Sequence, residues 1–111
     1  MAERIPAITV AIIEPLPEEV SAVEDALRAA VLAAHSEVGC ELYALHRIDE
    51  APVRFAMVEQ WADAAALAAH MAGDGIKALL PVLGSKLAGA PQILRLTALA
   101  DGDAKLGRLV V

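Results

Sequence analysis

The segment Glu59–Met71 gathers residues whose types could do chemistry in one place. It holds the only tryptophan of the chain, Trp61, with Glu59 two residues before it and His70 nine residues after it. Imidazole exchanges protons near neutral pH, and an indole offers a large flat surface to a ligand. We therefore interpret this segment as one wall of a small-molecule pocket.

Each of these residues also has a plainer structural explanation. His70 falls in the last turn of an expected helix, where the helix dipole favours a charged imidazole, and Trp61 could be an ordinary core residue. Glu59 falls on an apolar row, where a carboxylate is costly without a partner. It could pair with His46 or His70, or reach the edge of the sheet. These alternatives stay open at the level of the sequence.

Other site chemistries lack the residues that they require. The histidines at 35, 46 and 70 do not have metal-ligand spacing, and Cys40 alone makes no zinc site. The chain contains no glycine-rich phosphate loop and no dinucleotide-binding fingerprint. We therefore expect no metal and no cofactor.

Composition and charge narrow the class of protein. The 111 residues suit one domain, but 58% of them are hydrophobic and the mean hydropathy is +0.54. A small monomer has little interior in which to hide that surface, so we expect a homodimer, although alanine makes up much of the excess. The net charge of −6, with no basic cluster, argues against a nucleic-acid partner.

The sequence also predicts a cytoplasmic protein without a membrane partner. A single cysteine, Cys40, excludes an internal disulfide and suits a reducing compartment. The apolar run Ile5–Ile13 contains Pro6 and is followed by acidic residues, so it indicates a strand rather than a signal peptide. No stretch reaches the roughly 18 apolar residues of a membrane span.

The order of the expected elements predicts the fold. The strands are Ile5–Ile13, Cys40–Ile48, Val53–Trp61 and Gln92–Leu99, and the helices are one from Glu18 to just before Gly39, Ala64–Met71 capped by Asp63, and Ile76–Leu87 containing Pro81. The order βαββαβ predicts a ferredoxin-like α+β fold, with a four-stranded antiparallel sheet and the helices on one face. Three strands are apolar on both faces, so a second sheet should cover the other face, as in a dimeric α+β barrel.

The expected hairpin sets which side chains share a face. A four-residue loop, Asp49–Pro52, would place Leu42 opposite Glu59, His46 opposite Phe55 and Cys40 opposite Trp61. A slip of one residue would move one row to the other face. All three aromatic residues lie on these two strands while the helices are rich in alanine, so a cavity between the layers and close packing are both compatible with the sequence.

We divide the chain into one domain, residues 1–100, and a tail, residues 101–111. The tail ends in Leu109-Val110-Val111, which is apolar for a free terminus. It could add an edge strand, reach a partner subunit as a dimer arm, or be disordered.

Over residues 5–99 the chain resembles the antibiotic biosynthesis monooxygenase domain family, the quinol-monooxygenase-like dimeric α+β barrels. The residues that carry the resemblance are Gly39-Cys40 with Tyr43 and Leu45, the loop Asp49–Pro52, Phe55, Glu59-Gln60-Trp61, Ala66-Leu67, His70, and Lys77-Ala78-Leu79. The family also contains haem-degrading enzymes, which resemble one another in a first-strand asparagine and a histidine in the later helix. Here the first strand offers only Thr9, Leu80 stands at the place of that histidine, and His70 stands where those enzymes carry a catalytic tryptophan. The resemblance therefore disfavours haem degradation.

The resemblance implies a cofactor-independent monooxygenase that oxidises a quinol, a polyphenol or a similar aromatic small molecule with O2. A phenol gives electrons to oxygen best as its anion, so a base must take its proton in a dry pocket. We expect His70 to be that base and Glu59 to orient it, and the substrate-binding side chains are expected to be Trp61, Tyr43, Phe55 and Met57. The alternative is a non-catalytic dimeric domain that binds a hydrophobic small molecule or acts as a stress-related scaffold. A ferredoxin-like isomerase also stays open.

Overall fold

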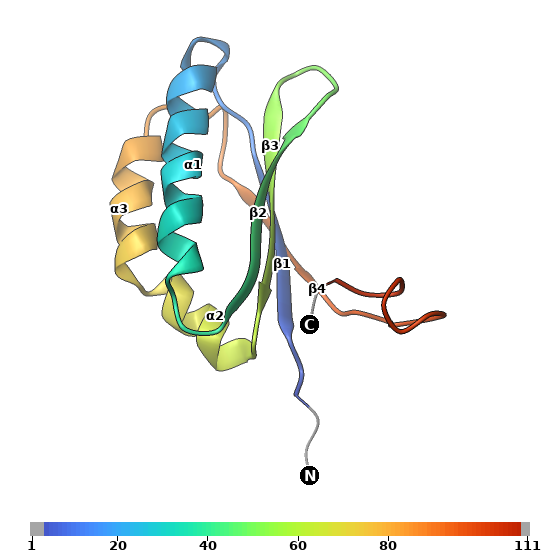
Figure 1. Cartoon of the computed structure of the whole chain (residues 1–111). Helices are drawn as coiled ribbons and strands as arrows, with labels where there is room; N and C mark the ends of the chain where they lie inside the picture. The colour runs from blue at the N-terminus through green and yellow to red at the C-terminus, as the bar shows by residue number, and fades with distance from the viewer. Residues whose placement is uncertain (1–3, 110–111) are drawn as a thin grey trace.

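Three helices lie on one face of a four-stranded antiparallel sheet in the computed structural model, which describes residues 4–109 (Figure 1). The strands are β1 (Ala7–Ile13), β2 (Cys40–Ile48), β3 (Arg54–Trp61) and β4 (Gln92–Leu96), in the spatial order β2-β3-β1-β4. The helices are α1 (Val20–His35), α2 (Ala64–Met71) and α3 (Asp74–Leu83), with a short 3-10 turn, η1 (Pro17–Glu19), before α1. The predicted ferredoxin-like fold is confirmed.

Local signals explain where the first two helices begin and which side they bury. The backbone turns at Pro17, and α1 then buries Val23, Leu27 and Ala34, which recur at helical spacing. The Asp63 carboxylate accepts a hydrogen bond from the Ala66 N–H and caps α2 as predicted. This cap fixes the turn that carries the chain from Trp61 into the helix of His70.

Several boundaries differ from the sequence prediction by a few residues. Strand β1 begins at Ala7, after Pro6, which has no N–H to give to a ladder. Helix α3 spans Asp74–Leu83 instead of Ile76–Leu87, because Gly73 supplies an extended N-cap and Gly84 follows its last residue, while Pro81 stays inside the helix. Strand β4 ends at Leu96.

The predicted register of the β2–β3 hairpin is wrong by one residue over most of its length. Ile48 pairs with Arg54, so the loop has five residues (49–53) instead of four. Tyr43 therefore lies opposite Glu59, and Leu45 lies opposite Met57. An irregularity between positions 40 and 42 restores the expected pairing of Cys40 with Trp61. The shift brings Tyr43, rather than Leu42, onto the face that the helices cover.

The two faces of the sheet differ in their cover. Under the helices, the largest fully buried side chains are Trp61, Phe55, Leu27, Met57 and Val23. On the opposite face, Val10 and Val58 are only half-buried, and Leu94 and Leu96 are 41% and 42% exposed. The second face is thus largely apolar, as the strand pattern predicts. Among the described residues Ile8 and Gln60 on this face are buried, whereas Val10, Val58, Leu94 and Leu96 are partly open to water.

After β4 the chain leaves the sheet (Figure 1). Residues 97–109 form turns without a strand, and the Asp103 carboxylate accepts hydrogen bonds from the N–H groups of Lys105 and Leu106. The part of the tail prediction that concerns Val110 and Val111 lies outside the described residues.

Within residues 4–109, no single helix is long and apolar enough to cross a membrane. Helices α2 and α3 reach that length and composition only when they are taken together, and they are bent by 49° at the break between them.

Candidate functional site

A cluster of polar and aromatic side chains is buried between the sheet and α2. Strand β3 contributes Glu59 and Trp61, β2 contributes Tyr43, and α2 contributes His70, each at most 5% exposed. Glu37, in the loop between α1 and β2, closes the cluster from the side of the solvent, with its side chain 26% exposed. The structure thus brings together four of the six residues that the sequence analysis selects.

The indole of Trp61 links the members of this cluster. Glu59 and Trp61 are two positions apart on β3, so their side chains share one face of the sheet. There Trp61 Nε1–H donates a hydrogen bond to Glu59 Oε1 at 3.0 Å. The indole also stacks on His70, with ring centroids 4.4 Å apart. Tyr43 meets His70 edge to face, with centroids 5.3 Å apart. The imidazole is therefore held between two aromatic rings.

His70 also lies between two carboxylates. Its Nδ1 is 2.9 Å from Glu37 Oε1, which is hydrogen-bonding distance, whereas its Nε2 is 3.8 Å from Glu59 Oε1, which is too long for a hydrogen bond. The described residues give this buried Nε2 no hydrogen-bond partner. Of the two partners considered for Glu59, His70 is the one nearby. His46 is exposed and bonds instead to the Ala44 carbonyl oxygen.

The electrostatics of the cluster favour protonated carboxyl and phenol groups. Burial raises the pKa of Glu59 above its usual range, and the charge of Glu37 adds to this effect, while the Trp61 hydrogen bond and His70 oppose it. Burial likewise raises the pKa of Tyr43, with further contributions from Glu59 and Glu37. Glu59 and Tyr43 therefore hold their protons more tightly than they would in water.

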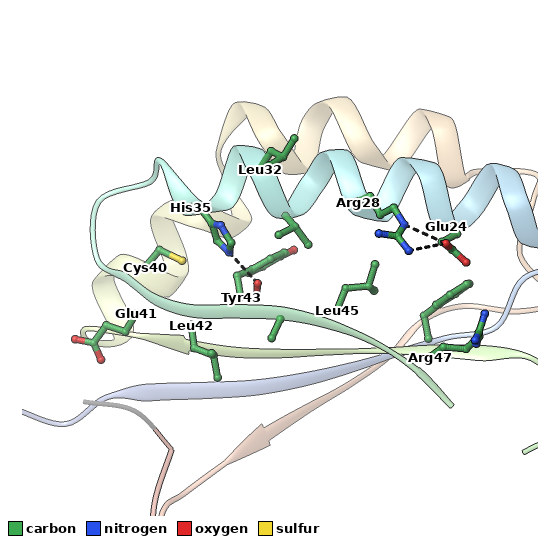
Figure 2. A pocket seen from close by; sticks show the side chains of 13 residues that line it. Glu24, Arg28, Leu32, His35, Cys40, Glu41, Leu42, Tyr43, Leu45 and Arg47 are labelled. Carbon is green, nitrogen blue, oxygen red and sulfur yellow. Dashed lines mark hydrogen bonds and ion pairs between the residues drawn. The ribbon is translucent and has the colours of Figure 1, made fainter. Parts of the chain in front are cut away.

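A groove of about 970 Å³ runs between α1 and the edge strand β2 (Figure 2). Apolar side chains line its interior, among them Val31, Leu45 and Phe55. Arg28 and Arg47 stand toward one end, where Arg28 forms an ion pair with Glu24 at 2.9 Å. The groove offers an apolar surface with cationic groups at its end, which suits a flat organic molecule with a polar or anionic substituent.

Tyr43 belongs to both the groove and the cluster. Its hydroxyl points into the space between α1 and β2 (Figure 2), and its ring packs against His70. Of the residues expected to bind substrate, Tyr43 and Phe55 line the groove, whereas Trp61 and Met57 are fully buried. Glu59 and His70 do not line the groove either. Tyr43 therefore separates the groove from the candidate base.

The sequence analysis missed several residues of the site. Glu37 is not among the predicted site residues because its partner His70 lies 33 positions away. The one indication in the sequence is that Glu37 lies two residues before Gly39-Cys40, which carries part of the family resemblance. The groove-lining residues of α1 recur at helical spacing on one side of the helix, and they are Glu24, Arg28, Val31, Leu32 and His35. His35 is exposed, and its Nε2 lies 3.0 Å from the Tyr43 carbonyl oxygen.

The described part of the chain contains no cluster of side chains that could bind a metal ion. No group of three or more His, Cys, Asp or Glu side chains there could hold a metal ion. Cys40 is not in a disulfide, and burial together with Glu37 and Glu59 raises the pKa of its thiol. The thiol is therefore poorly suited to act as a nucleophile.

The comparison with protein families gives one match. Residues 6–81 match the family model described as Antibiotic biosynthesis monooxygenase. The chain matches no curated protein.

Solved structures with the same fold are numerous, and some are at least 30% identical to this chain. PA3566 from Pseudomonas aeruginosa is 31% identical with a TM-score of 0.82, and the alignment covers 90% of this chain and 100% of that one. A Caulobacter crescentus CB15 protein, whose name carries the same family description, is 30% identical with a TM-score of 0.76, covering 86% and 92%. Rv0793 from Mycobacterium tuberculosis, 21% identical with a TM-score of 0.81 and covering 88% and 99%, shares the fold.

Proposed function

Because the chain belongs to the antibiotic biosynthesis monooxygenase family, we propose that it is a cofactor-independent monooxygenase that oxidises a quinol, a polyphenol or a similar aromatic molecule with O2. One observation carries the proposal: an apolar groove of about 970 Å³ and a buried proton-accepting cluster meet at Tyr43. The groove supplies a place for a flat ring, and the cluster supplies the group that takes its proton.

The reaction draws its electrons from the substrate. A ring carbon loses its hydrogen and the phenol loses the hydrogen of its O–H group, the carbon gains one oxygen atom as a carbonyl, and the second atom of O2 leaves as water with those two hydrogens. The substrate anion is the electron donor, since loss of the phenolic proton raises the electron density of the ring. The protein therefore has to accept a proton and to exclude water while the anion reacts.

His70 is the candidate for the proton acceptor, and Tyr43 controls its access. His70 is 3% exposed and does not line the groove, so a substrate can meet it only if the Tyr43 ring turns aside. The Tyr43 hydroxyl points into the space between α1 and β2 (Figure 2), but the residue is only 5% exposed, so such a turn requires its neighbours to move as well. Glu59 lies 3.8 Å from His70 Nε2, and Glu37, 2.9 Å from His70 Nδ1, would balance the charge that the imidazole gains.

The proposed enzyme is a homodimer, and we place it in the cytoplasm. The half-buried Val10 and Val58 and the exposed Leu94 and Leu96 lie on the sheet face that the helices leave open. Two such faces packed together would remove this apolar surface from water, at roughly 25 cal/mol for each Å² buried. The single cysteine and the acidic charge support the cytoplasmic location.

A second function is favoured by the burial of the cluster. His70, Glu59 and Trp61 are all absent from the groove lining. A protein that binds a hydrophobic molecule in the groove without converting it would need only Tyr43, Phe55 and their apolar neighbours. Binding without turnover is therefore the second candidate.

A substrate panel tests the proposal and separates the two candidates. The purified protein is incubated with hydroquinones, naphthols and polyphenols under isotopically labelled O2, while oxygen uptake and label in the product are measured. The proposal expects protein-dependent uptake, with one labelled oxygen atom in the product. Saturable binding of these compounds without uptake would favour the second candidate.

A further inference from the structure

Two carboxylates compete for the proton of one imidazole. Glu37 Oε1 lies 2.9 Å from His70 Nδ1, and Glu59 Oε1 lies 3.8 Å from His70 Nε2. A carboxylate oxygen accepts hydrogen bonds, so the nitrogen at hydrogen-bonding distance must carry the proton. A neutral imidazole has only one N–H, and the geometry gives it to the side of Glu37.

Glu59 is a weak competitor for this proton. Its Oε1 already accepts the hydrogen bond from Trp61 Nε1–H at 3.0 Å. The raised pKa of Glu59 further favours the neutral carboxyl, which attracts an N–H less than a carboxylate does. His70 Nε2 is consequently left buried without a partner in the described chain.

The surroundings of Glu37 hold its carboxylate in place. A Cβ atom built at Gly75 would lie 3.4 Å from Glu37 Oε2, and one at Gly73 would lie 3.9 Å from Oε1. The carboxylate thus rests against the first turn of α3, where the positive end of the helix dipole favours an anion. The side chain is partly open to solvent, with 26% of its surface exposed, while it contacts His70.

We propose that Glu37 is a positioning residue that keeps the proton of the neutral His70 ring on Nδ1 and leaves Nε2 as the nitrogen that can accept a proton. Its meaning for catalysis rests on the proposed function, whereas the position of the proton can be measured without turnover. Without Glu37, no acceptor holds the N–H on Nδ1, so the N–H moves to Nε2 on the side of Glu59, and Nε2 can no longer accept a proton.

The test is an NMR measurement of the imidazole nitrogens in the full-length protein. The unprotonated ring nitrogen of a neutral histidine has a distinct chemical shift, so the spectrum identifies the tautomer. We expect neutral His70 to be protonated at Nδ1 in the wild type and at Nε2 in Glu37→Ala. Glu37→Gln, which preserves the shape of the side chain and an oxygen that can accept from Nδ1–H, should retain the Nδ1–H tautomer.

Internal controls are present in the same spectrum. His35 Nε2 is 3.0 Å from the Tyr43 carbonyl oxygen, and His46 Nδ1 is 3.1 Å from the Ala44 carbonyl oxygen. Each contact predicts its own tautomer, and neither should change in the Glu37 variants. Glu50→Gln removes an exposed carboxylate beyond the far end of β2 and should leave all three histidines unchanged.

The outcomes separate this inference from the proposed function. A wild-type His70 that is protonated at Nε2, or that stays doubly protonated wherever the protein is folded, would overturn the inference whether or not the protein turns over a substrate. So would an unchanged His70 tautomer in folded Glu37→Ala. If a substrate is oxidised, Glu37→Ala should lower kcat on the order of tenfold to hundredfold while KM changes little, since Glu37 does not line the groove.

Discussion

Trp61 stacks on His70 with ring centroids 4.4 Å apart and ring planes inclined by 27°. Trp61 is the only tryptophan of the chain, so the tryptophan fluorescence reports on the surroundings of this one side chain, which include His70. Because an imidazole in contact with an indole quenches its emission, His70→Ala should be brighter than the wild type under the same conditions. His46→Ala, which removes an exposed histidine, should match the wild type. Equal emission from folded His70→Ala and wild type would contradict the stack.

The raised pKa of Glu59 predicts how stability depends on pH. The folded state holds this proton more tightly than the unfolded chain, so the contribution to stability is fully present below the ordinary glutamate value of 4.5 and is lost as the pH rises through the folded pKa. Each pKa unit of upward shift corresponds to about 1.4 kcal/mol. Glu59→Gln, which keeps an oxygen acceptor for Trp61, should flatten this decline.

Denaturant unfolding of wild type and Glu59→Gln across the pH range above 4.5 measures that slope. Glu41 does not interfere with this measurement. The hydrogen bond from Arg4 lowers the pKa of Glu41, so its contribution to stability is present above pH 4.5 and is lost only at lower pH. Parallel stability curves for the two proteins would show that Glu59 does not titrate as the structure requires.

Gly39 connects the loop of Glu37 to β2 in a conformation that other residues avoid. Its φ is +85°, and a Cβ atom there would lie 2.5 Å from the Cβ of Ala66. We expect Gly39→Ala to lower the free energy of unfolding by about 2 kcal/mol or more, from backbone strain and from contact with α2. Gly89→Ala is the matched control, because nothing lies within 4 Å of its added Cβ. Similar losses in the two variants would argue against the close approach of this loop to α2.

The proposed dimer predicts a specific sensitivity of the open sheet face. Val58 lies on the central strand β3 and faces away from the helices, so Val58→Glu would place a charge in the interface and should give a monomer. Leu80→Glu makes the same change on α3, where the side chain is 58% exposed, and should leave the assembly intact. Sedimentation analysis measures both. A monomeric wild type at micromolar concentration would contradict the dimer.

Features set by neighbouring residues could be predicted from the sequence. The cap that Asp63 gives to α2 and the shared face of Glu59 and Trp61 both follow from local periodicity and hydrogen bonding. The hairpin register could not be obtained in this way, because a loop of four residues and a loop of five are both plausible between β2 and β3. The two loop lengths shift the register by one residue, which exchanges the side chains that β2 presents on each face. The one extra loop residue is what places Tyr43 on the face that the helices cover.

The long-range parts of the site also lay beyond sequence reasoning. Glu37 and His70 are separated by 33 positions and meet only when α2 packs beside the end of α1. The alanine-rich helices were compatible with both a cavity and close packing. The structure contains both: a filled interior around Trp61 and Met57, and a groove along β2 where α1 passes the sheet edge.

Oxygen uptake by His70→Ala tests the central claim most directly. With the best substrate of the panel, we expect the variant to lose a factor of about 10² or more in kcat, because the substrate anion no longer forms. KM should change little, because His70 does not line the groove. An unchanged rate in a folded His70→Ala protein, or no protein-dependent uptake by the wild type with any compound of the panel, would contradict the proposed function.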